Sequence, residues 1–286
     1  MGGSTMNKRQ SKMIEAGPYS LDYSKKTLIM GILNVTPDSF SDGGKYSTLE
    51  KAVERARRMV EEGVDIIDIG GESTRPGYES VSELEELERV APVIEAITKE
   101  ISVPVSIDTY KSSVAKGALD AGAHIINDIW GAKADLNMAK VAAHYDVPII
   151  LMHNRDNRDY VHFYRDVVCD LFESISLVKQ AGVSDDKIIL DPGIGFAKDF
   201  SENIAMMQDL DKLVSLGYPI LLGTSKKSFI GQALSLPVDE RTEGTAATIC
   251  YGVQKGCQIV RVHDVKEVSR MVRMTDILMG KEIANG

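Results

Sequence analysis

The sequence contains few cysteines, and their spacing excludes the sites that cysteines commonly build. Cys169, Cys250 and Cys257 form no CxxC pair and do not have the spacing of metal ligands. Reduced thiols that pack as small apolar side chains are the simplest interpretation. This interpretation favours a reducing compartment, so we expect a cytoplasmic protein without structural disulfides.

Long apolar runs and clustered basic residues are also lacking. No apolar run approaches the ~18 residues that would cross a bilayer, and we expect no membrane association. Lys8, Arg9 and Lys12 precede no apolar stretch of the kind found in a secretory signal. The 33 Lys and Arg residues and 42 Asp and Glu residues give a net charge of -9. The basic residues do not cluster as they do in nucleic-acid-binding proteins, so we expect no nucleic-acid partner. An anionic ligand would therefore need a few local cations and backbone donors.

What the sequence does contain is one repeated pattern: a short β-branched apolar run, a polar loop and an amphipathic helix. The predicted strands are Thr27–Asn34, Val64–Ile69, Pro104–Asp108, His124–Asn127, Val147–Met152, Lys187–Asp191, Pro219–Gly223 and Gln258–Val262. The predicted helices are Thr48–Glu62, Ser82–Lys99, Ser112–Asp120, Asn137–His144, Asp166–Gln180, Ser201–Leu216, Glu243–Lys255 and Val265–Met279. Five of the helices are followed by a glycine that is suited to a left-handed helix end, namely Gly63, Gly122, Gly182, Gly217 and Gly256.

Eight strand–helix units over ~260 residues predict an α/β fold of the (β/α)8 TIM barrel type, in a single domain. Continuous apolar strands are typical of a parallel sheet that is covered on both faces. A doubly wound open sheet is the alternative, but no Gly-rich dinucleotide fingerprint follows the first strand. Met1–Thr5 precedes a second methionine and is typical of a segment added by cloning. We expect residues 1–17 to form a tail and residues 18–286 the barrel, which would begin with a short hairpin near 18–27.

Polar residues stand at nearly every predicted strand end, where barrel enzymes carry their active sites. In chain order these are Asn34, Asp68, Asp108, Asn127, His153, Asp191, Ser225–Ser228, Arg261 and His263. Arg261 and His263 alternate with two valines, so both should face the same side of the last strand. The strand-to-helix loops 35–47 and 70–81 are long and polar, and long polar loops at strand ends commonly carry function.

Seven segments together resemble the dihydropteroate synthase family between about residues 27 and 275. They are Asn34–Gly44 (NVTPDSFSDGG), Asp68–Gly77 (DIGGESTRPG), Ile107–Thr109 (IDT), Ile126–Asp128 (IND), Leu190–Phe196 (LDPGIGF), Gly223–Gly231 (GTSKKSFIG) and Arg261–Val265 (RVHDV). The resemblance implies a TIM barrel that joins 6-hydroxymethyl-7,8-dihydropterin pyrophosphate to p-aminobenzoate, which gives 7,8-dihydropteroate and pyrophosphate. It also implies Mg²⁺ as cofactor, sulfonamides as competitors of p-aminobenzoate and a homodimer formed by the late helices.

The resemblance also implies roles for individual residues. Asp108, Lys227, Arg261 and His263 would be catalytic. The pterin would be bound by Asp108, Asn127, Ile129, Met152, Asp191, Phe196 and Lys227. The pyrophosphate would be bound by Asn34, Thr74, Arg261 and His263, and Mg²⁺ by Asn34 and Asp42. The p-aminobenzoate would be bound by Phe40, Thr74, Arg75, Pro76, Phe196, Lys227 and Ser228.

Some of these residues also have simple structural explanations, and other functions are compatible with the site. Asp191 begins an Asp-Pro-Gly run that is also typical of a turn after a strand, and a single histidine such as His263 is commonly structural. Family members usually have arginine where this sequence has Lys226, so a bidentate contact is not expected there. Other functions compatible with a pterin site are a methyltetrahydrofolate-dependent methyltransferase and a non-catalytic pterin-binding paralogue. The sequence shows no Ser-His-Asp or Cys-His arrangement for nucleophilic catalysis.

Overall fold

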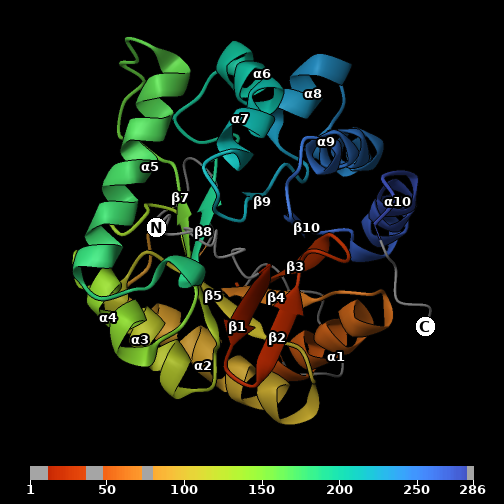
Figure 1. The fold of residues 1–286 in the computed structure, drawn as a ribbon. Helices are drawn as coiled ribbons and strands as arrows, with labels where there is room; N and C mark the ends of the chain where they lie inside the picture. The colour runs from red at the N-terminus through yellow and green to blue at the C-terminus, as the bar shows by residue number, and fades with distance from the viewer. Residues whose placement is uncertain (1–11, 37–47, 73–79, 282–286) are drawn as a thin grey trace, which may run out of the picture.

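The computed structural model describes residues 12–36, 48–72 and 80–281, and these form a parallel β-barrel surrounded by helices (Figure 1). The barrel strands are β3 (Leu28–Asn34), β4 (Ile66–Gly70), β5 (Val105–Asp108), β6 (Ile125–Asp128), β7 (Ile149–Met152), β8 (Ile188–Asp191), β9 (Leu221–Leu222) and β10 (Ile259–Val262). They pair in the order β8-β7-β6-β5-β4-β3-β10-β9. A bridge between Leu190 and Ile220 closes the circle, so the predicted barrel is confirmed.

The helices lie on the outside of the barrel and mostly match the predicted segments. They are α1 (Thr48–Glu61), α2 (Glu83–Glu100), α3 (Ser112–Asp120), α4 (Met138–Tyr145), α5 (Phe163–Gln180), α6 (Phe200–Gln208), α7 (Leu210–Val214), α8 (Ser228–Leu234), α9 (Thr242–Gln254) and α10 (Val265–Leu278). The helix predicted over 201–216 is two helices, because Asp209 leaves the helical region and ends α6. Helix α8 has no counterpart among the predicted helices, since its seven residues are too few for a periodic pattern.

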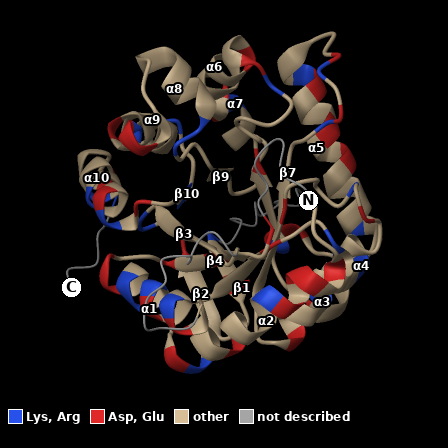
Figure 2. Cartoon of the chain, turned by 180° about the vertical axis from the view of Figure 1, so that it is seen from behind, with Lys and Arg blue, Asp and Glu red and all other residues tan. Residues whose placement is uncertain are grey.

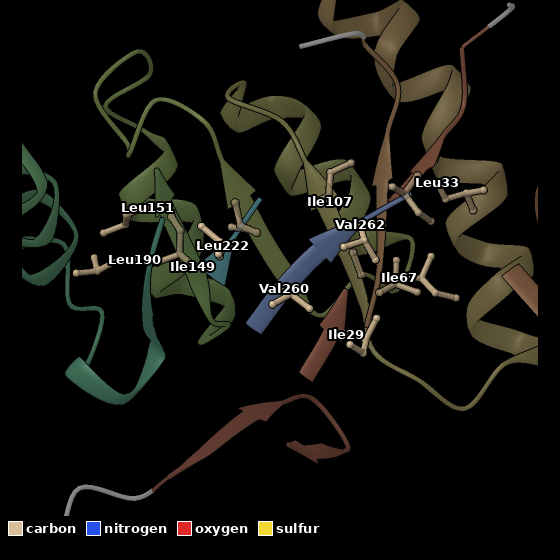
Figure 3. Packing of buried hydrophobic residues seen from close by; sticks show 14 of the residues in the cluster. Ile29, Leu33, Ile67, Ile107, Ile149, Leu151, Leu190, Leu222, Val260 and Val262 are labelled. Carbon is tan, nitrogen blue, oxygen red and sulfur yellow. The ribbon is translucent and has the colours of Figure 1, made fainter. Parts of the chain in front are cut away.

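Alternation along each strand separates two apolar layers. One side of the strands packs against the helices, as the close view of the residues around Ile67, Leu151 and Val260 shows (Figure 3). The other side fills the lower barrel with Met30, Ile125 and their neighbours. An antiparallel hairpin of β1 (Met13–Ala16) and β2 (Tyr19–Asp22) packs against this inner layer. Ile14 and Ala16 of the hairpin are fully buried there. The hairpin therefore lies over 13–22, and not over 18–27 as predicted.

The ends and the surfaces of the helices agree with their sequences. All five predicted helix-ending glycines adopt positive φ, between 92° and 110°. Acidic and basic side chains are mixed over α1, α2 and α3 (Figure 2), with ion pairs such as Arg58–Glu54 on the helix surface. None of the helices in the described ranges is both long and apolar enough to span a bilayer.

Candidate active site

The carboxyl ends of the strands gather the predicted polar residues at one mouth of the barrel. Ile29 and Leu33 of β3 pack outwards, so Asn34 comes one position later, on the inner side. By the same alternation Val260 and Val262 face the helices and Arg261 faces the barrel interior, as predicted. A cavity of about 460 Å³ opens there; it is lined by Ile32, Asn34, Gly195, Phe196, Gly223, Ser225, Lys226, Lys227, Ser228, Val238, Arg241, Arg261 and His263.

Two buried carboxylates hold Arg261, which itself lines this cavity. Its Nε lies 2.6 Å from Asp68 Oδ2 and its Nη2 lies 2.5 Å from Asp108 Oδ2. Burial raises the pKa of Asp108 to about 7, against the lowering effect of Arg261 and with a further rise from Asp68. Two carboxylates thus share one guanidinium, and a single cation cannot fully compensate both.

Asp68 also fixes the orientation of the Asn127 amide. Asn127 Nδ2 donates to Asp68 Oδ2 at 3.0 Å, so the amide oxygen of Asn127 points to the other side. Within the described residues, Asp68 Oδ1, Asp108 Oδ1 and Ser106 Oγ are buried without a hydrogen-bond partner. Buried polar atoms are rarely left unpaired, and two of these three are strong acceptors. The region next to Arg261 is therefore suited to a ligand that presents N–H groups.

Lys227 and Phe196 line one wall of the cavity, and the buried Asp191 lies close to Lys227. Asp191 Oδ1 accepts from the backbone N–H of Gly193 at 2.7 Å, and the whole residue is 7% exposed. Burial raises the pKa of Asp191, while Lys227 and Arg261 lower it. Lys227 Nζ donates to the carbonyl of Ile194 and lies 4.6 Å from the centroid of the Phe196 ring. The wall therefore combines a cation and an aromatic face, with an anionic acceptor next to it.

His263 and Ser225 form a polar pair at the rim. The Ser225 hydroxyl lies 2.8 Å from His263 Nδ1 and accepts from the His263 backbone N–H at 3.2 Å. Asn34, His263 and Arg261, three of the four residues predicted to bind pyrophosphate, line the same cavity, and the fourth, Thr74, lies outside the described residues.

The structure brings together most, but not all, of the predicted site residues. Met152 is buried at the end of β7, and Ile129 is partly exposed just after β6. Ser228 is exposed beside Lys227 and lines the cavity. The remaining predicted residues lie outside the described ranges, namely Phe40, Asp42, Thr74, Arg75 and Pro76. We predicted no role for Asp68 from the sequence, although its place near the end of the predicted strand Val64–Ile69 was the available signal.

Comparison with known proteins decides the family. The pterin binding enzyme family matches residues 30–263. Dihydropteroate synthase of Bacillus subtilis is 60% identical over 272 residues, which cover 95% of each chain. The chain belongs to the dihydropteroate synthases of the pterin-binding family.

Solved dihydropteroate synthases share the fold as well. The Clostridium difficile enzyme, crystallised in the presence of pteroic acid, has a TM-score of 0.88 at 50% identity and covers 90% of this chain and 98% of its own. The Yersinia pestis enzyme, solved with a sulfonamide drug, has a TM-score of 0.88 at 39% identity and covers 94% of this chain and 99% of its own. Like its relatives, this dihydropteroate synthase family member is a transferase.

Lys226 stands where the family resemblance predicts an arginine. Its Nζ pairs with Asp264 Oδ1 at 2.9 Å, and its backbone adopts the left-handed conformation with a φ of 57°. Arg241 Nη1 donates to the Lys226 carbonyl at 3.0 Å and thereby holds the turn that carries Lys227. The lysine at 226 therefore has an ion-pair partner of its own beside the cavity.

Proposed function

We propose that this chain condenses 6-hydroxymethyl-7,8-dihydropterin pyrophosphate with p-aminobenzoate to give 7,8-dihydropteroate and pyrophosphate. The observation that carries the proposal is one cavity lined by Lys227, Arg261 and His263, with buried carboxylates next to it. Asp68 and Asp108 contact Arg261, and Asp191 lies buried near Lys227. These groups suit the N–H groups of a pterin and the charge of a pyrophosphate.

The proposed pterin contacts follow from donor and acceptor chemistry. Asp108 Oδ1 and the second carboxylate oxygen of Asp191 accept from the amino and ring N–H groups, and the Asn127 amide oxygen adds a further acceptor. A Cβ atom on Gly223 would stand 3.9 Å from both Asp191 Oδ2 and Arg261 Cβ. No side chain at position 223 occupies this place, and in the proposal the pterin ring lies against the glycine. Met152 and Ile129 supply apolar contact in this proposal.

In the proposed mechanism the bond between the methylene carbon and the pyrophosphate oxygen breaks first, and its electron pair leaves with pyrophosphate. Arg261 and His263 neutralise that charge, while Asp108 and Asp191 stabilise the cation that spreads into the pterin. The neutral arylamine of p-aminobenzoate then attacks the methylene carbon, and its N–H proton passes to solvent. Phe196 flanks the ring of p-aminobenzoate, and Lys227 and Ser228 meet its carboxylate. Slow cleavage of the pterin pyrophosphate without the amine would support dissociation before attack, and its absence would contradict it.

We also propose Mg²⁺ as the metal that this reaction uses. The described residues hold no group of three His, Cys, Asp or Glu side chains arranged for a metal. Mg²⁺ often sits on substrate phosphates with only one or two protein ligands. Asn34 has a hard amide oxygen that lies 3.5 Å from where a Cβ on Gly70 would be, which leaves room beside it. Asn34 would hold the ion with Asp42 and the phosphate oxygens, and the ion would neutralise leaving-group charge. Thr74 would bind pyrophosphate, and Phe40, Arg75 and Pro76 would border p-aminobenzoate.

A homodimer formed through the late helices is part of the same proposal. Helix α10 exposes Met274 at 51% and Leu278 at 75%, which is apolar surface suited to a second copy. Light scattering after gel filtration should give twice the mass of the chain. The cytoplasmic location belongs to the proposal too. The division into a tail over 1–17 and a barrel over 18–286 places the boundary too late, because β1 (Met13–Ala16) is already packed against the barrel.

The test of the function is product formation from the two substrates with Mg²⁺. Chromatography should show 7,8-dihydropteroate only when both substrates are present, and a sulfonamide should compete with p-aminobenzoate. Methyl transfer from methyltetrahydrofolate would favour the methyltransferase alternative. Pterin binding without either reaction would favour a non-catalytic paralogue.

The pH dependence of kcat/KM should be bell-shaped, with limbs near pH 7 and pH 8. Burial raises the pKa of Asp108 to about 7 and lowers that of Lys227 to about 8. The carboxylate forms as pH rises through the first value, and the ammonium is lost as pH rises through the second. Because kcat/KM reports the free enzyme, steady-state rates over roughly pH 5.5 to 9.5 at low substrate would show both limbs. A flat profile across this range would contradict the assignment.

Replacing Asp68 with asparagine tests the support beneath Arg261. The amide that results keeps an acceptor but removes one charge, so kcat/KM should fall by about 10- to 100-fold as Arg261 loses its alignment. The charge of Asp68 raises the pKa of Asp108, so the acidic limb should move to lower pH. The exposed Asp186→Asn serves as control. An unchanged acidic limb in a folded Asp68→Asn variant would show that the two carboxylates are not coupled.

A further inference from the structure

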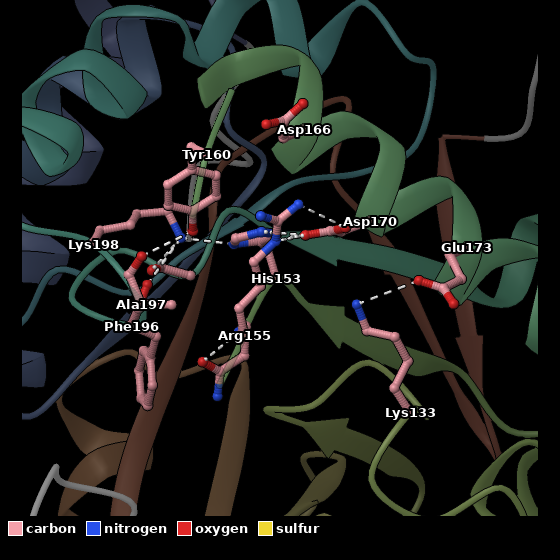
Figure 4. A network of polar contacts seen from close by, with 12 residues as sticks. Lys133, His153, Arg155, Tyr160, Asp166, Asp170, Glu173, Phe196, Ala197 and Lys198 are labelled. Atoms are coloured by element: carbon pink, nitrogen blue, oxygen red, sulfur yellow. Dashed lines mark hydrogen bonds and ion pairs between the residues drawn. The ribbon is translucent and has the colours of Figure 1, made fainter. Parts of the chain in front are cut away.

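Lys198 is a buried cation that the mechanism above does not use. It lies after β8, is 9% exposed and donates to three acceptors (Figure 4). Its Nζ lies 3.0 Å from the Gly193 carbonyl, 3.1 Å from the Phe196 carbonyl and 2.8 Å from His153 Nδ1. An ammonium has three donors and no acceptor, so these three partners satisfy it completely.

The partners of His153 fix its proton. Since the ammonium can only donate, His153 Nδ1 must be the acceptor and Nε2 carries the hydrogen. Nε2 lies 3.0 Å from Asp170 Oδ2, which also accepts from Arg155 Nε at 2.5 Å (Figure 4). Burial lowers the pKa of His153 to about 4, which agrees with a neutral ring. Burial also lowers the pKa of Lys198, to about 7, while three acceptors within reach favour its charged form.

The segment that Lys198 holds is the loop that carries Phe196 into the cavity. From the cavity side the same loop is held by Lys227, which donates to the Ile194 carbonyl and stacks on Phe196. The loop is tightly packed, because a Cβ on Gly193 would come within 2.0 Å of the His153 carbonyl oxygen. A Cβ on Gly195 would come within 2.9 Å of Lys227 Cδ. The loop is therefore fixed between two lysines, one on each side.

We propose that Lys198 and His153 form a positioning pair, which holds the 193–196 loop so that Phe196 can receive the p-aminobenzoate ring. The proposal deepens the function proposed above and rests on it. The pair lies behind the loop and contacts no substrate. It acts through two backbone carbonyls, so its loss should weaken the amine site more than the pterin site.

Kinetics of four variants test the pair. Lys198→Met should raise the KM for p-aminobenzoate about tenfold, because two loop carbonyls and His153 Nδ1 lose their donor. The Kd for the pterin pyrophosphate, measured by calorimetry, should change less than about threefold. His153→Asn should resemble wild type, because its amide oxygen replaces Nδ1, whereas His153→Leu should resemble Lys198→Met. The control is Lys133→Met, which removes a nearby cation that lies 3.9 Å from Glu173 and does not touch the loop.

Circular dichroism and thermal melting would establish that each variant is folded. A folded Lys198→Met with an unchanged KM for p-aminobenzoate, or with equal losses for both substrates, would overturn the proposal. If Lys198→Met does not fold, the two His153 variants decide, and equal KM values for His153→Leu and His153→Asn would overturn it. Hydrogen exchange of a peptide spanning 193–197 needs no turnover and should be faster in Lys198→Met. If the wild-type chain has no synthase activity but exchange is still faster in Lys198→Met, the proposed function is refuted. The role of Lys198 in holding the loop would be retained.

Discussion

Replacing Asp191 with asparagine should lower kcat/KM by about 10²- to 10³-fold, mainly through weaker pterin binding. The carboxylate is buried and accepts from the Gly193 backbone N–H with one oxygen. In the variant that N–H still needs an acceptor, so the amide oxygen must face Gly193. The amide nitrogen then faces the cavity and presents a donor where the pterin needs an acceptor. The substitution thus reverses the hydrogen-bond pattern as well as removing a charge.

The measurements for this variant are steady-state kinetics with both substrates and calorimetry with the pterin pyrophosphate. Asp186→Asn makes the same chemical change at an exposed position and should leave both values unaltered. A folded Asp191→Asn variant with wild-type pterin affinity would show that Asp191 only ends the strand, as the Asp-Pro-Gly turn alone could suggest.

Arg261→Met should affect both stability and catalysis. Methionine fills much of the same volume but leaves Asp68 and Asp108 buried without their shared cation. Breaking a buried ion pair by removing one partner costs about 3–5 kcal/mol, so the free energy of unfolding near pH 8 should fall by that amount. Activity should fall by about 10³-fold, because the proposed pyrophosphate site loses its strongest donor.

The stability deficit of Arg261→Met should depend on pH in a defined direction. Without the guanidinium, the pKa of Asp108 rises above the value of about 7 that it has with Arg261 present. The folded state then binds more protons than the unfolded state, so stability falls as pH rises from ~4 through that raised value. Urea unfolding at about pH 5 and about pH 8 should therefore show a smaller deficit at the lower pH. The double variant Asp68→Asn/Arg261→Met should recover part of the loss, and no recovery would contradict the shared-cation interpretation.

The barrel could be predicted from the sequence because each strand is a continuous apolar run followed by a polar end. The same alternation placed Arg261 inside the barrel, since Val260 and Val262 had to face the helices. The positive φ of the five helix-ending glycines followed from local backbone sterics. These features depend on residues close together in the chain, which a sequence pattern can report.

The interactions that the sequence could not predict join residues far apart in the chain. Asp68 meets Arg261 across 193 positions and Asn127 across 59, so neither contact leaves a local pattern. Lys198 and His153, 45 positions apart, become a pair only when β7 and β8 lie side by side. The hairpin was placed too late because its two strands of four residues are too short for a clear alternation.

The most direct test of the central claim is pyrophosphate release from 6-hydroxymethyl-7,8-dihydropterin pyrophosphate with Mg²⁺, followed with and without p-aminobenzoate. We predict sustained release only with the amine, one 7,8-dihydropteroate for each pyrophosphate, and a marked loss of rate in Lys227→Ala. No release in the presence of both substrates, by a chain that binds the pterin, would contradict it.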